Sequence, residues 1–312
     1  MPAPRPLASL SLDLDNKWSY LKTHGDTGWQ SLPSYLGTVV PRALDVLYKK
    51  QLKITFFIVG LDAAQEQSRP LLRSLADAGH EIGNHSFRHE PWLHLYSRQE
   101  LETELSQAEE NIEAATGQRP VGFRGPGFSF SQELLALLKL RGYVYDASTF
   151  PTFLGPLARA YYFMRSRLSA HQAEERKALF GSFREGFRSN KMYSWKTAAG
   201  DLVEVPVTTM PWFRVPIHVS YLLYLAGFSL VLARTYFSTA MHLCRLNGVQ
   251  PSLLLHPLDF LGGDDEKDLS FFPAMDLAGT FKVDFVAGVL EQYTAQFEVL
   301  PLVEHVRRAA PH

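Results

Sequence analysis

Two short stretches that lie far apart in the chain carry residue types that can bind a metal ion. The first runs from Asp13 to Asp15 with the sequence Asp-Leu-Asp, and the second runs from His85 to His89 with the sequence His-Ser-Phe-Arg-His. Two imidazoles and one carboxylate form a three-ligand nitrogen and oxygen set, which leaves positions open for water and substrate, as in catalytic sites. The second carboxylate is then a candidate general base. The pairing predicts a metal-dependent hydrolase.

Short β-rich runs alternate with helical stretches along the chain, which is the pattern of repeated β-α units around a parallel sheet. Apolar residues at helical spacing predict a helix over Arg98–Thr116, with Gly117 ending it. We therefore expect an α/β fold, an incomplete and distorted seven-stranded (β/α) barrel with insertions. The seven predicted strands are Leu10–Asp15, Ile54–Val59, Glu81–His85, Gly122–Arg124, Tyr143–Asp146, Leu202–Val207 and Ser252–His256.

The polar residues of both motifs fall at the carboxyl ends of predicted strands, where the loops of an α/β barrel form the active site. Asp13 and Asp15 end the first strand, and alternate positions on a strand face the same side. His85 ends the third strand, and His89 follows about one turn later if the chain coils helically there. Taken alone, an Asp-x-Asp is usually a solvated turn and a His-x-x-x-His is more often structural, so the hypothesis depends on the two motifs occurring together.

Several motifs, in order, resemble those of the polysaccharide deacetylase superfamily, the carbohydrate esterases that remove N-acetyl groups from chitin, peptidoglycan and related sugars. The resemblance runs from Ser11 to about Asp259, with unmatched segments between the motifs. It implies a barrel of the polysaccharide deacetylase type. The matching stretches are the spaced Asp-x-Asp of Asp13–Asp15, the strand Thr55–Phe57, the metal-binding motif Gly83–His89, the segment Arg124–Phe128 with Phe128 where many members have Tyr, the loose match Tyr145–Pro151, and Leu254–His256.

The resemblance implies that Asp15, His85 and His89 would bind one divalent metal. Zinc is the most frequent metal in the family, and cobalt, nickel, manganese and iron are the alternatives. Asp13 would be the general base, and Arg124 would pair with it and hold it ionised and oriented. A bound metal lowers the pKa of water to about 7, so a carboxylate base suffices at neutral pH.

Four further residues receive roles from the same resemblance. The backbone N–H of Phe128 would stabilise the oxyanion together with the metal, and Leu254 would line the small acyl pocket. His256 would protonate the leaving amine, and Asp146 would tune His256. Each also has an ordinary alternative: Arg124 could be a surface arginine in a turn, His256 a buried polar residue, and Asp146 the start of a turn.

Composition sets the outer limits of the interpretation. The chain has 312 residues, of which 46% are hydrophobic, and we expect one catalytic domain over residues 1–312. Because 31 basic residues face 32 acidic ones, nothing favours a nucleic-acid partner. The single cysteine, Cys244, excludes an intrachain disulfide, and no long apolar run follows the N-terminus. We expect a cytoplasmic protein, peripheral at the inner face of the cell membrane in the most specific form of the hypothesis.

A basic and aromatic insertion is expected at about 152–200. Between Gly155 and Gly200 the chain carries nine Lys or Arg residues and three Glu residues, with Tyr, Phe and Trp interleaved. Such a surface suits an anionic membrane or a phosphate-bearing ligand. A partner protein or a soluble nucleotide sugar remains an alternative.

An apolar segment is expected at about 212–244. The part from Val215 to Ala233 contains no Asp, Glu, Lys or Arg, and it is close to the length that spans a bilayer. Pro216, His218 and two serines interrupt it, and this disfavours a full span. A buried barrel helix and a helix lying on a membrane both remain open.

These features together predict a hydrolase that removes an N-acyl group, in the first instance N-acetyl, from an amino sugar. The specific form of the hypothesis is a sugar carried on a polyprenyl phosphate, in peripheral contact with an anionic membrane. One alternative is a hydrolase of non-sugar amides of the cyclic imide or ureide type. Another is a non-catalytic carbohydrate-binding or lipid-binding module.

Overall fold

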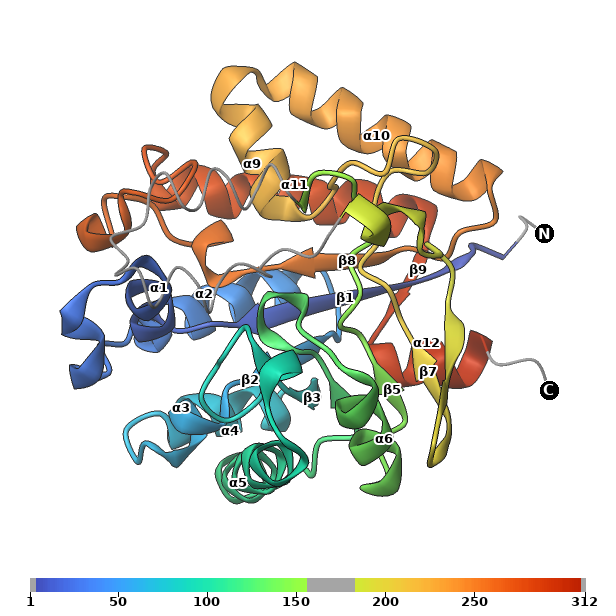
Figure 1. Ribbon diagram of the computed structural model, residues 1–312. Coiled ribbons are helices and arrows are strands. Elements are labelled where there is room, and N and C mark those ends of the chain that lie inside the picture. Colours follow the sequence, from blue (N-terminus) through green and yellow to red (C-terminus); the bar gives the residue numbers. More distant parts are fainter. Residues whose placement is uncertain (1–3, 156–182, 310–312) are drawn as a thin grey trace.

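The computed structural model describes residues 4–155 and 183–309. In that part of the chain a single sheet lies at the centre of the molecule, and helices pack around it (Figure 1). Its spatial order is β6-β7-β5-β4-β3-β2-β1-β8, and β9 also pairs with β1. The strands are β1 (Leu7–Leu14), β2 (Thr55–Ile58), β3 (Glu81–Asn84), β4 (Gly122–Phe123), β5 (Tyr145–Asp146), β6 (Tyr193–Thr197), β7 (Gly200–Glu204), β8 (Ser252–Leu255) and β9 (Glu298–Leu300).

Helices surround the sheet, with α9 and α10 on the opposite side of the molecule from α5 and α6 (Figure 1). The described α-helices are α1 (Lys17–His24), α2 (Leu36–Lys49), α3 (Gly60–Ala64), α4 (Arg69–Asp77), α5 (Arg98–Thr116), α6 (Gln132–Leu140), α9 (Val219–Phe228), α10 (Leu230–Leu246), α11 (Gly279–Gln296) and α12 (Leu302–Ala309).

The predicted (β/α) barrel is confirmed as a curled, incomplete barrel. All seven predicted strands are present, and every strand pairing is parallel except that of β6 with β7. The sequence did not reveal β6 or β9. Strand β6 is a half-exposed edge strand, and β9 is three residues long, so neither has a strong apolar signal.

Backbone contacts beyond β7 draw the two ends of the sheet together. The predicted strand Leu202–Val207 ends early, at Glu204, but Val205 and Val207 still donate to the carbonyls of Asp146 and Thr149. Thr208 N–H then donates to the carbonyl of Ser252 in β8 at 3.0 Å. One segment therefore bridges β5 and β8, and this narrows the open side of the barrel.

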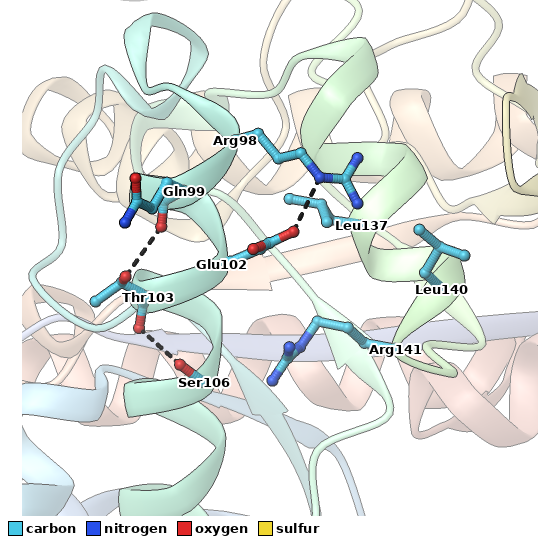
Figure 2. A pocket seen from close by; sticks show the side chains of 8 residues that line it. All are labelled: Arg98, Gln99, Glu102, Thr103, Ser106, Leu137, Leu140 and Arg141. Atoms are coloured by element: carbon cyan, nitrogen blue, oxygen red, sulfur yellow. Dashed lines mark hydrogen bonds and ion pairs between the residues drawn. The ribbon is translucent and has the colours of Figure 1, made fainter.

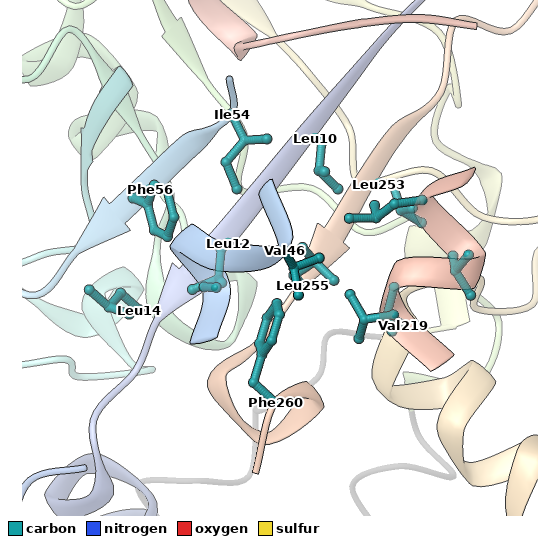
Figure 3. Packing of buried hydrophobic residues seen from close by; sticks show 14 of the residues in the cluster. Leu10, Leu12, Leu14, Val46, Ile54, Phe56, Val219, Leu253, Leu255 and Phe260 are labelled. Atoms are coloured by element: carbon teal, nitrogen blue, oxygen red, sulfur yellow. The ribbon is translucent and has the colours of Figure 1, made fainter. Parts of the chain in front are cut away.

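Strand β1 shows how the sequence divides the interior from the outer layer. Leu10, Leu12 and Leu14 are buried in the main hydrophobic cluster (Figure 3). Val46 of α2 and Val219 of α9 belong to the same cluster. Because side chains alternate along a strand, the intervening Ser9, Ser11 and Asp13 face the barrel interior. This alternation places polar chemistry on one face and helix packing on the other.

The helix predicted over Arg98–Thr116 is confirmed residue for residue as α5. Ser97 and Glu100 form a capping box at its start, which satisfies backbone N–H groups there. At its end Gly117 has φ = 73°, a left-handed conformation that favours glycine.

The apolar segment forms two helices rather than one. The chain is extended at Ser229 (φ −164°, ψ 123°), which separates α9 from α10. Among the described residues no helix is long and apolar enough to cross a membrane. Leu222, Leu223 and Ala226 pack into the main cluster, as the buried-helix alternative predicts.

Part of the basic insertion can be followed in the structure. Arg188 pairs with Glu185 and lies 5.1 Å from the ring centres of both Phe130 and Trp195, and Lys196 pairs with Asp201. Local partners therefore neutralise some of the predicted positive charge. Many of the other charged and aromatic residues of the insertion lie outside the described residues. These are Arg159, Tyr161, Tyr162, Phe163, Arg165, Arg167, Glu174, Glu175, Arg176, Lys177 and Phe180.

Candidate active site

Three predicted metal ligands converge at the carboxyl ends of β1 and β3. Asp15 Oδ1 lies 3.2 Å from His85 Nε2 and 3.0 Å from His89 Nε2. One ligand atom from each residue lies within 4.8 Å of the others. Burial works to raise the pKa of Asp15, but the His89 and His85 side chains outweigh it and lower that pKa well below its ordinary value. The carboxyl group therefore stays ionised, as a metal ligand must.

The loop that carries the two histidines is not the helical turn that the sequence suggested. Ser86 and His89 have positive φ values of 63° and 54°. Side chains satisfy the loop N–H groups instead: Asn84 Oδ1 accepts from Ser86, and Ser86 Oγ accepts from His89. Glu104 of α5 accepts from both Phe87 N–H (2.9 Å) and Arg88 N–H (2.6 Å) through Oε1. A strand residue, a serine and a helix carboxylate thus replace the missing helical hydrogen bonds.

Neighbouring groups orient the ligands. His85 Nδ1 lies 2.7 Å from the Arg124 carbonyl, and only a protonated Nδ1 can donate to a carbonyl. Nε2 of His85 is therefore left with a free lone pair for a metal. The Tyr35 hydroxyl donates to the Asp15 carbonyl at 2.6 Å and fixes the backbone at the third ligand.

Asp62 is a buried carboxyl group beside the ligands that the sequence did not single out. Its Oδ1 accepts from Asn16 Nδ2 (2.7 Å) and from Trp18 Nε1 (2.9 Å). Burial raises the pKa of Asp62 to about 7, against these two hydrogen bonds and with help from the Asp15 charge. It anchors the chain directly after the Asp-x-Asp motif.

Asp13 and Arg124 form the buried ion pair that the resemblance implied. Arg124 Nη1 donates to Asp13 Oδ1 at 2.7 Å and to Ser11 Oγ at 2.8 Å, and its Nε donates to the Ala147 carbonyl. The guanidinium is fully buried and stacks 4.4 Å from the Phe57 ring centre. Because four groups hold it, Arg124 fixes the direction of the Asp13 carboxylate.

Leu254 and His256 share the interior face with Asp13. Ser11 is in register with Leu254, so Leu254, which is fully buried, faces the interior beside Ser11. Continued by one residue beyond the Leu12–Leu255 pair, the same register sets His256 opposite Asp13. The candidate base and acid therefore stand on neighbouring strands at one mouth.

The structure changes what was expected of Phe128. Its backbone N–H donates to the Gly125 carbonyl at 3.0 Å within a tight turn in which Gly127 and Phe128 have φ values of 59° and 60°. The N–H is therefore not free for an oxyanion in this conformation. The oxyanion role of Phe128 would require this turn hydrogen bond to be shared or opened.

The expectation that Asp146 tunes His256 is corrected. Asp146 Oδ1 accepts from Ser148 Oγ at 2.6 Å, and Asp146 is also hydrogen-bonded to Glu204. Burial, followed by the Asp146 charge, raises the pKa of Glu204 well above its ordinary value, so this carboxyl pair holds a proton. Ser148 in turn accepts from Gly125 N–H at 2.8 Å. The pair thus supports the Arg124 segment rather than His256.

The partner of His256 is a serine on α9. Ser220 Oγ donates to Asp259 Oδ1 at 2.7 Å and lies 3.1 Å from His256 Nδ1. Because the Ser220 hydroxyl donates its proton to Asp259, His256 Nδ1 must be the donor to Ser220 Oγ. This leaves Nε2 of His256 as the nitrogen available to a substrate. The carboxylate of Asp259 also accepts from the His256 backbone N–H. Sequence reasoning missed Ser220 because it lies in an apolar segment with no local signal.

Aromatic rings line the side of the site next to His256. Phe128 and Phe150 stack at 4.9 Å, His218 lies 5.8 Å from Phe150, and His218 lies 5.8 Å from His256. Burial, and then the neighbouring His256, lower the pKa of His218 to about 3, so this imidazole is neutral. These rings form an aromatic wall on the His256 side of the site.

The donor set fits one divalent metal. Two imidazole nitrogens and one carboxylate oxygen converge, a hydrogen bond leaves His85 Nε2 free to coordinate, and the carboxylate is ionised. The residues do not discriminate zinc from the other first-row metals that accept this set.

A surface hollow between α5 and α6 lies away from this site (Figure 2). Arg98 pairs with Glu102 and Glu133, and Arg141 pairs with Glu109. The charged groups there already satisfy one another, so the hollow shows no convergent chemistry.

Comparison with known proteins shows which proteins this chain resembles. Residues 26–145 match the family model for polysaccharide deacetylase, which covers His85, His89 and Arg124. The crystal structure of a putative polysaccharide deacetylase from Mycobacterium smegmatis covers 99% of this chain and 94% of that one, with a TM-score of 0.56 and 19% identity. That likeness shows the fold. Over residues 26–145 the chain is therefore similar to the polysaccharide deacetylase family.

Curated relatives match over part of the chain. A peptidoglycan deacetylase of Helicobacter pylori is 31% identical over 151 residues, 46% of this chain and 49% of that protein. The peptidoglycan-N-acetylmuramic acid deacetylase of Bacillus subtilis is 34% identical over 110 residues, 35% of this chain and 41% of that protein. The chain thus spans about half the length, or less, of the relatives it matches.

Proposed function

We propose that this protein is a metal-dependent hydrolase that removes an N-acetyl group from an amino sugar. The observation that carries the proposal is the placement of a buried Asp13–Arg124 pair beside the Asp15, His85 and His89 set. A ligand set with a separate, oriented carboxylate at its side is the arrangement that water activation requires.

The chain's own residues divide the chemistry between them. A divalent metal bound by Asp15, His85 and His89 would acidify water and polarise the amide carbonyl. Asp13, directed by Arg124, takes the proton from the attacking water. His256, on the neighbouring strand with Nδ1 held by Ser220, delivers a proton to the leaving nitrogen from Nε2. Leu254 borders the acyl pocket from the interior face of β8.

The finer form of the proposal concerns the substrate and its location. The matched relatives are named for peptidoglycan, which is built from N-acetylated amino sugars, and this supports an amino-sugar substrate. We propose that the sugar is linked to a polyprenyl phosphate and that the protein works in the cytoplasm, in contact with the inner face of the membrane. Support comes from the basic and apolar segments and from the single, buried Cys244. Zinc is the metal we propose.

Two alternatives differ in what they require of the same residues. A hydrolase of cyclic imides or ureides would need the same base and metal, and only its substrate separates it. A non-catalytic binding module would need neither base nor acid, whereas Asp13 and His256 are both positioned and hydrogen-bonded. The geometry favours a catalyst.

Acyl release from a substrate panel tests the proposal. The zinc-loaded protein is incubated with free N-acetylglucosamine oligomers, nucleotide-linked N-acetyl sugars, lipid-linked N-acetyl sugars and a cyclic imide, and acyl loss is measured by mass spectrometry. We expect acetate release from at least one sugar class. Ring opening of the imide alone, seen as a mass gain of one water, would replace the proposal with the non-sugar alternative.

Two variants connect that activity to the site. Asp13→Asn should retain the metal and lose about 10²- to 10⁴-fold in kcat, because the base is removed while the ligands stay. Asp15→Ala should lose both metal and activity. Metal content by mass spectrometry is the second readout. Full metal occupancy in Asp15→Ala, or normal turnover in Asp13→Asn, would refute the assigned roles.

A further inference from the structure

Helix α9 connects the candidate active site with an exposed apolar corner. Near its start, Ser220 contacts His256 at 3.1 Å. Its ten residues rise about 15 Å to the extended Ser229, where α10 begins. Around that break lies the apolar corner, the exposed side chains of Tyr224, Phe228, Leu230, Val231 and Leu232. The two most exposed are Phe228 at 71% and Val231 at 74%.

A row of rings runs along α9 from the acid to the corner. His218 lies 5.8 Å from His256 and 6.3 Å from Tyr221. Tyr221 lies 6.4 Å from Tyr224, and Tyr224 lies 5.1 Å from Phe228. The side of the site next to His256 therefore continues as an aromatic track that ends in exposed apolar side chains.

A second exposed element is fastened to the same helices. The loop before α9 turns back on itself through a hydrogen bond from Met210 N–H to the Val215 carbonyl. Trp212 and Phe213 at its tip are 66% and 61% exposed. Tyr236 of α10 donates to the Pro216 carbonyl, and its ring lies 5.8 Å from Tyr221. Trp and Phe are among the side chains that favour a membrane interface.

Within the segment that forms these elements, the charged residues are all basic. Between Glu204 and Asp259 the sequence has no acidic residue, and its three charged residues there are Arg214, Arg234 and Arg245. Arg234 is exposed on α10, close in sequence to the apolar corner. A segment with exposed apolar side chains and arginines, and no carboxylate of its own, is complementary to a bilayer with anionic headgroups.

We propose that the apolar corner, together with the Trp212–Phe213 loop tip, docks on an anionic lipid bilayer, and that the aromatic track of α9 guides an apolar lipid anchor to the active site. The second half of this inference rests on the proposed amino-sugar function, and the docking itself does not. It names the substrate class as one whose sugar is carried on a lipid.

Other occupants of the corner fit the observations less well. Residues 156–182 carry five Lys or Arg residues and two Glu residues, so their net charge repels the arginines near the corner. A second copy of the chain would bring the same arginines against each other across a self-complementary contact. Both of these alternatives would place positive charge against the arginines near the corner, whereas an anionic bilayer would place negative charge there.

Vesicle flotation tests the docking without reference to activity. The full-length protein should float with vesicles of phosphatidylglycerol and phosphatidylethanolamine, less with neutral phosphatidylcholine vesicles, and less at high salt. The double variant Phe228→Ser/Val231→Ser should lower the partition coefficient about tenfold or more, because two apolar side chains no longer enter the bilayer. Leu140→Ser is the matched control: Leu140 is 62% exposed on α6, on the opposite side of the molecule, and its loss should leave flotation unchanged.

The outcomes separate this inference from the proposed function. Loss of flotation in the double variant, with deacetylation of a soluble substrate retained, supports docking at the corner. No flotation of the unaltered protein, or equal flotation of the double variant, overturns the docking even where soluble substrates are turned over. If the unaltered protein forms a dimer and binds no vesicles, and the double variant is a monomer, the corner is instead a contact with a second copy of the chain, and the docking proposal is overturned.

Discussion

The nitrogen that His256 presents to a substrate is decided by two residues with no obvious motif. Ser220 links His256 Nδ1 to the Asp259 carboxylate, and the same carboxylate accepts from the His256 backbone. Lys282 is buried nearby: burial lowers its pKa to about 8, whereas the Asp259 charge opposes that shift. The acid is therefore oriented from the helix side of the barrel, by α9 and the turn after β8.

A positioning role for Ser220 and Asp259 makes a specific kinetic prediction. Asp259→Asn and Ser220→Ala should lower kcat by about 10- to 100-fold with little change in KM, because the imidazole loses its orientation but the sugar contacts remain. Ser220→Thr, which restores a hydroxyl, should recover most of the loss. The pH–rate profile and kcat and KM on one soluble N-acetyl sugar provide the measurement.

The control for these variants is Ser238→Ala, at an exposed serine on α10. The positioning role would be contradicted if the substitutions changed KM and not kcat. It would also be contradicted if Ser220→Thr, with the same stability as the unaltered protein, did not restore kcat.

At the scale of elements, α5 supports the metal-binding loop from outside the sheet. Glu104 is buried in the middle of α5, and its Oε1 accepts from two consecutive N–H groups of the His85–His89 loop. The loop carbonyls of Ser86 and Phe87 accept from Gly60 and Leu61 at the start of α3. Two helices therefore hold a loop whose own conformation includes two left-handed residues.

Removing the Glu104 carboxylate should weaken metal binding at a distance. Glu104→Ala leaves two buried N–H groups without their acceptor, so we expect metal affinity to fall about 10- to 100-fold, as for other groups that support ligands. Glu104→Gln retains an acceptor oxygen and should lie close to the unaltered protein. Competition with a chelator measures the affinity, and Glu110→Ala, on the exposed side of α5, is the control. Unchanged metal affinity in Glu104→Ala would show that the His85–His89 loop keeps its conformation without the Glu104 carboxylate.

At the scale of the whole molecule, buried neutral histidines couple stability to pH. The Ile54 N–H donates to His80 Nδ1 at 3.2 Å, which requires that nitrogen to be unprotonated. Burial, and then Lys53, lower the pKa of His80 to about 4. Burial, and then Arg308, likewise lower the pKa of His305 to about 4. An unfolded histidine binds its proton near pH 6.5, so the unfolded state gains protons first as the pH falls.

The free energy of unfolding should therefore fall between about pH 6.5 and pH 4. For His80 alone the loss is about 3 kcal/mol, because its pKa falls from 6.5 to about 4 and each pKa unit corresponds to about 1.4 kcal/mol. Urea unfolding at pH 7.5 and pH 4.5 should show a smaller decrease for His80→Gln than for the unaltered protein. His242→Gln, at an exposed position of α10, is the comparison. Equal pH dependence in His80→Gln and the unaltered protein would contradict the prediction.

Local sequence was sufficient for features that depend on neighbouring residues. Alternation along β1 placed Asp13 and Asp15 on one face, and helical spacing with a final glycine determined α5 from Arg98 to Thr116. The ligand set and the Asp13–Arg124 pair were implied by the resemblance of the motifs to a known family, and the structure brings both groups of residues together.

Tertiary structure alone decided the contacts between distant segments. The sequence pointed to Asp146 as the partner of His256, but Ser220 holds that place because α9 packs against β8. It suggested a helical turn between His85 and His89, but Glu104 from α5 stabilises a left-handed loop. A local pattern records which face a residue takes; which residue stands opposite it depends on how helices and strands pack, and that is a property of the whole fold.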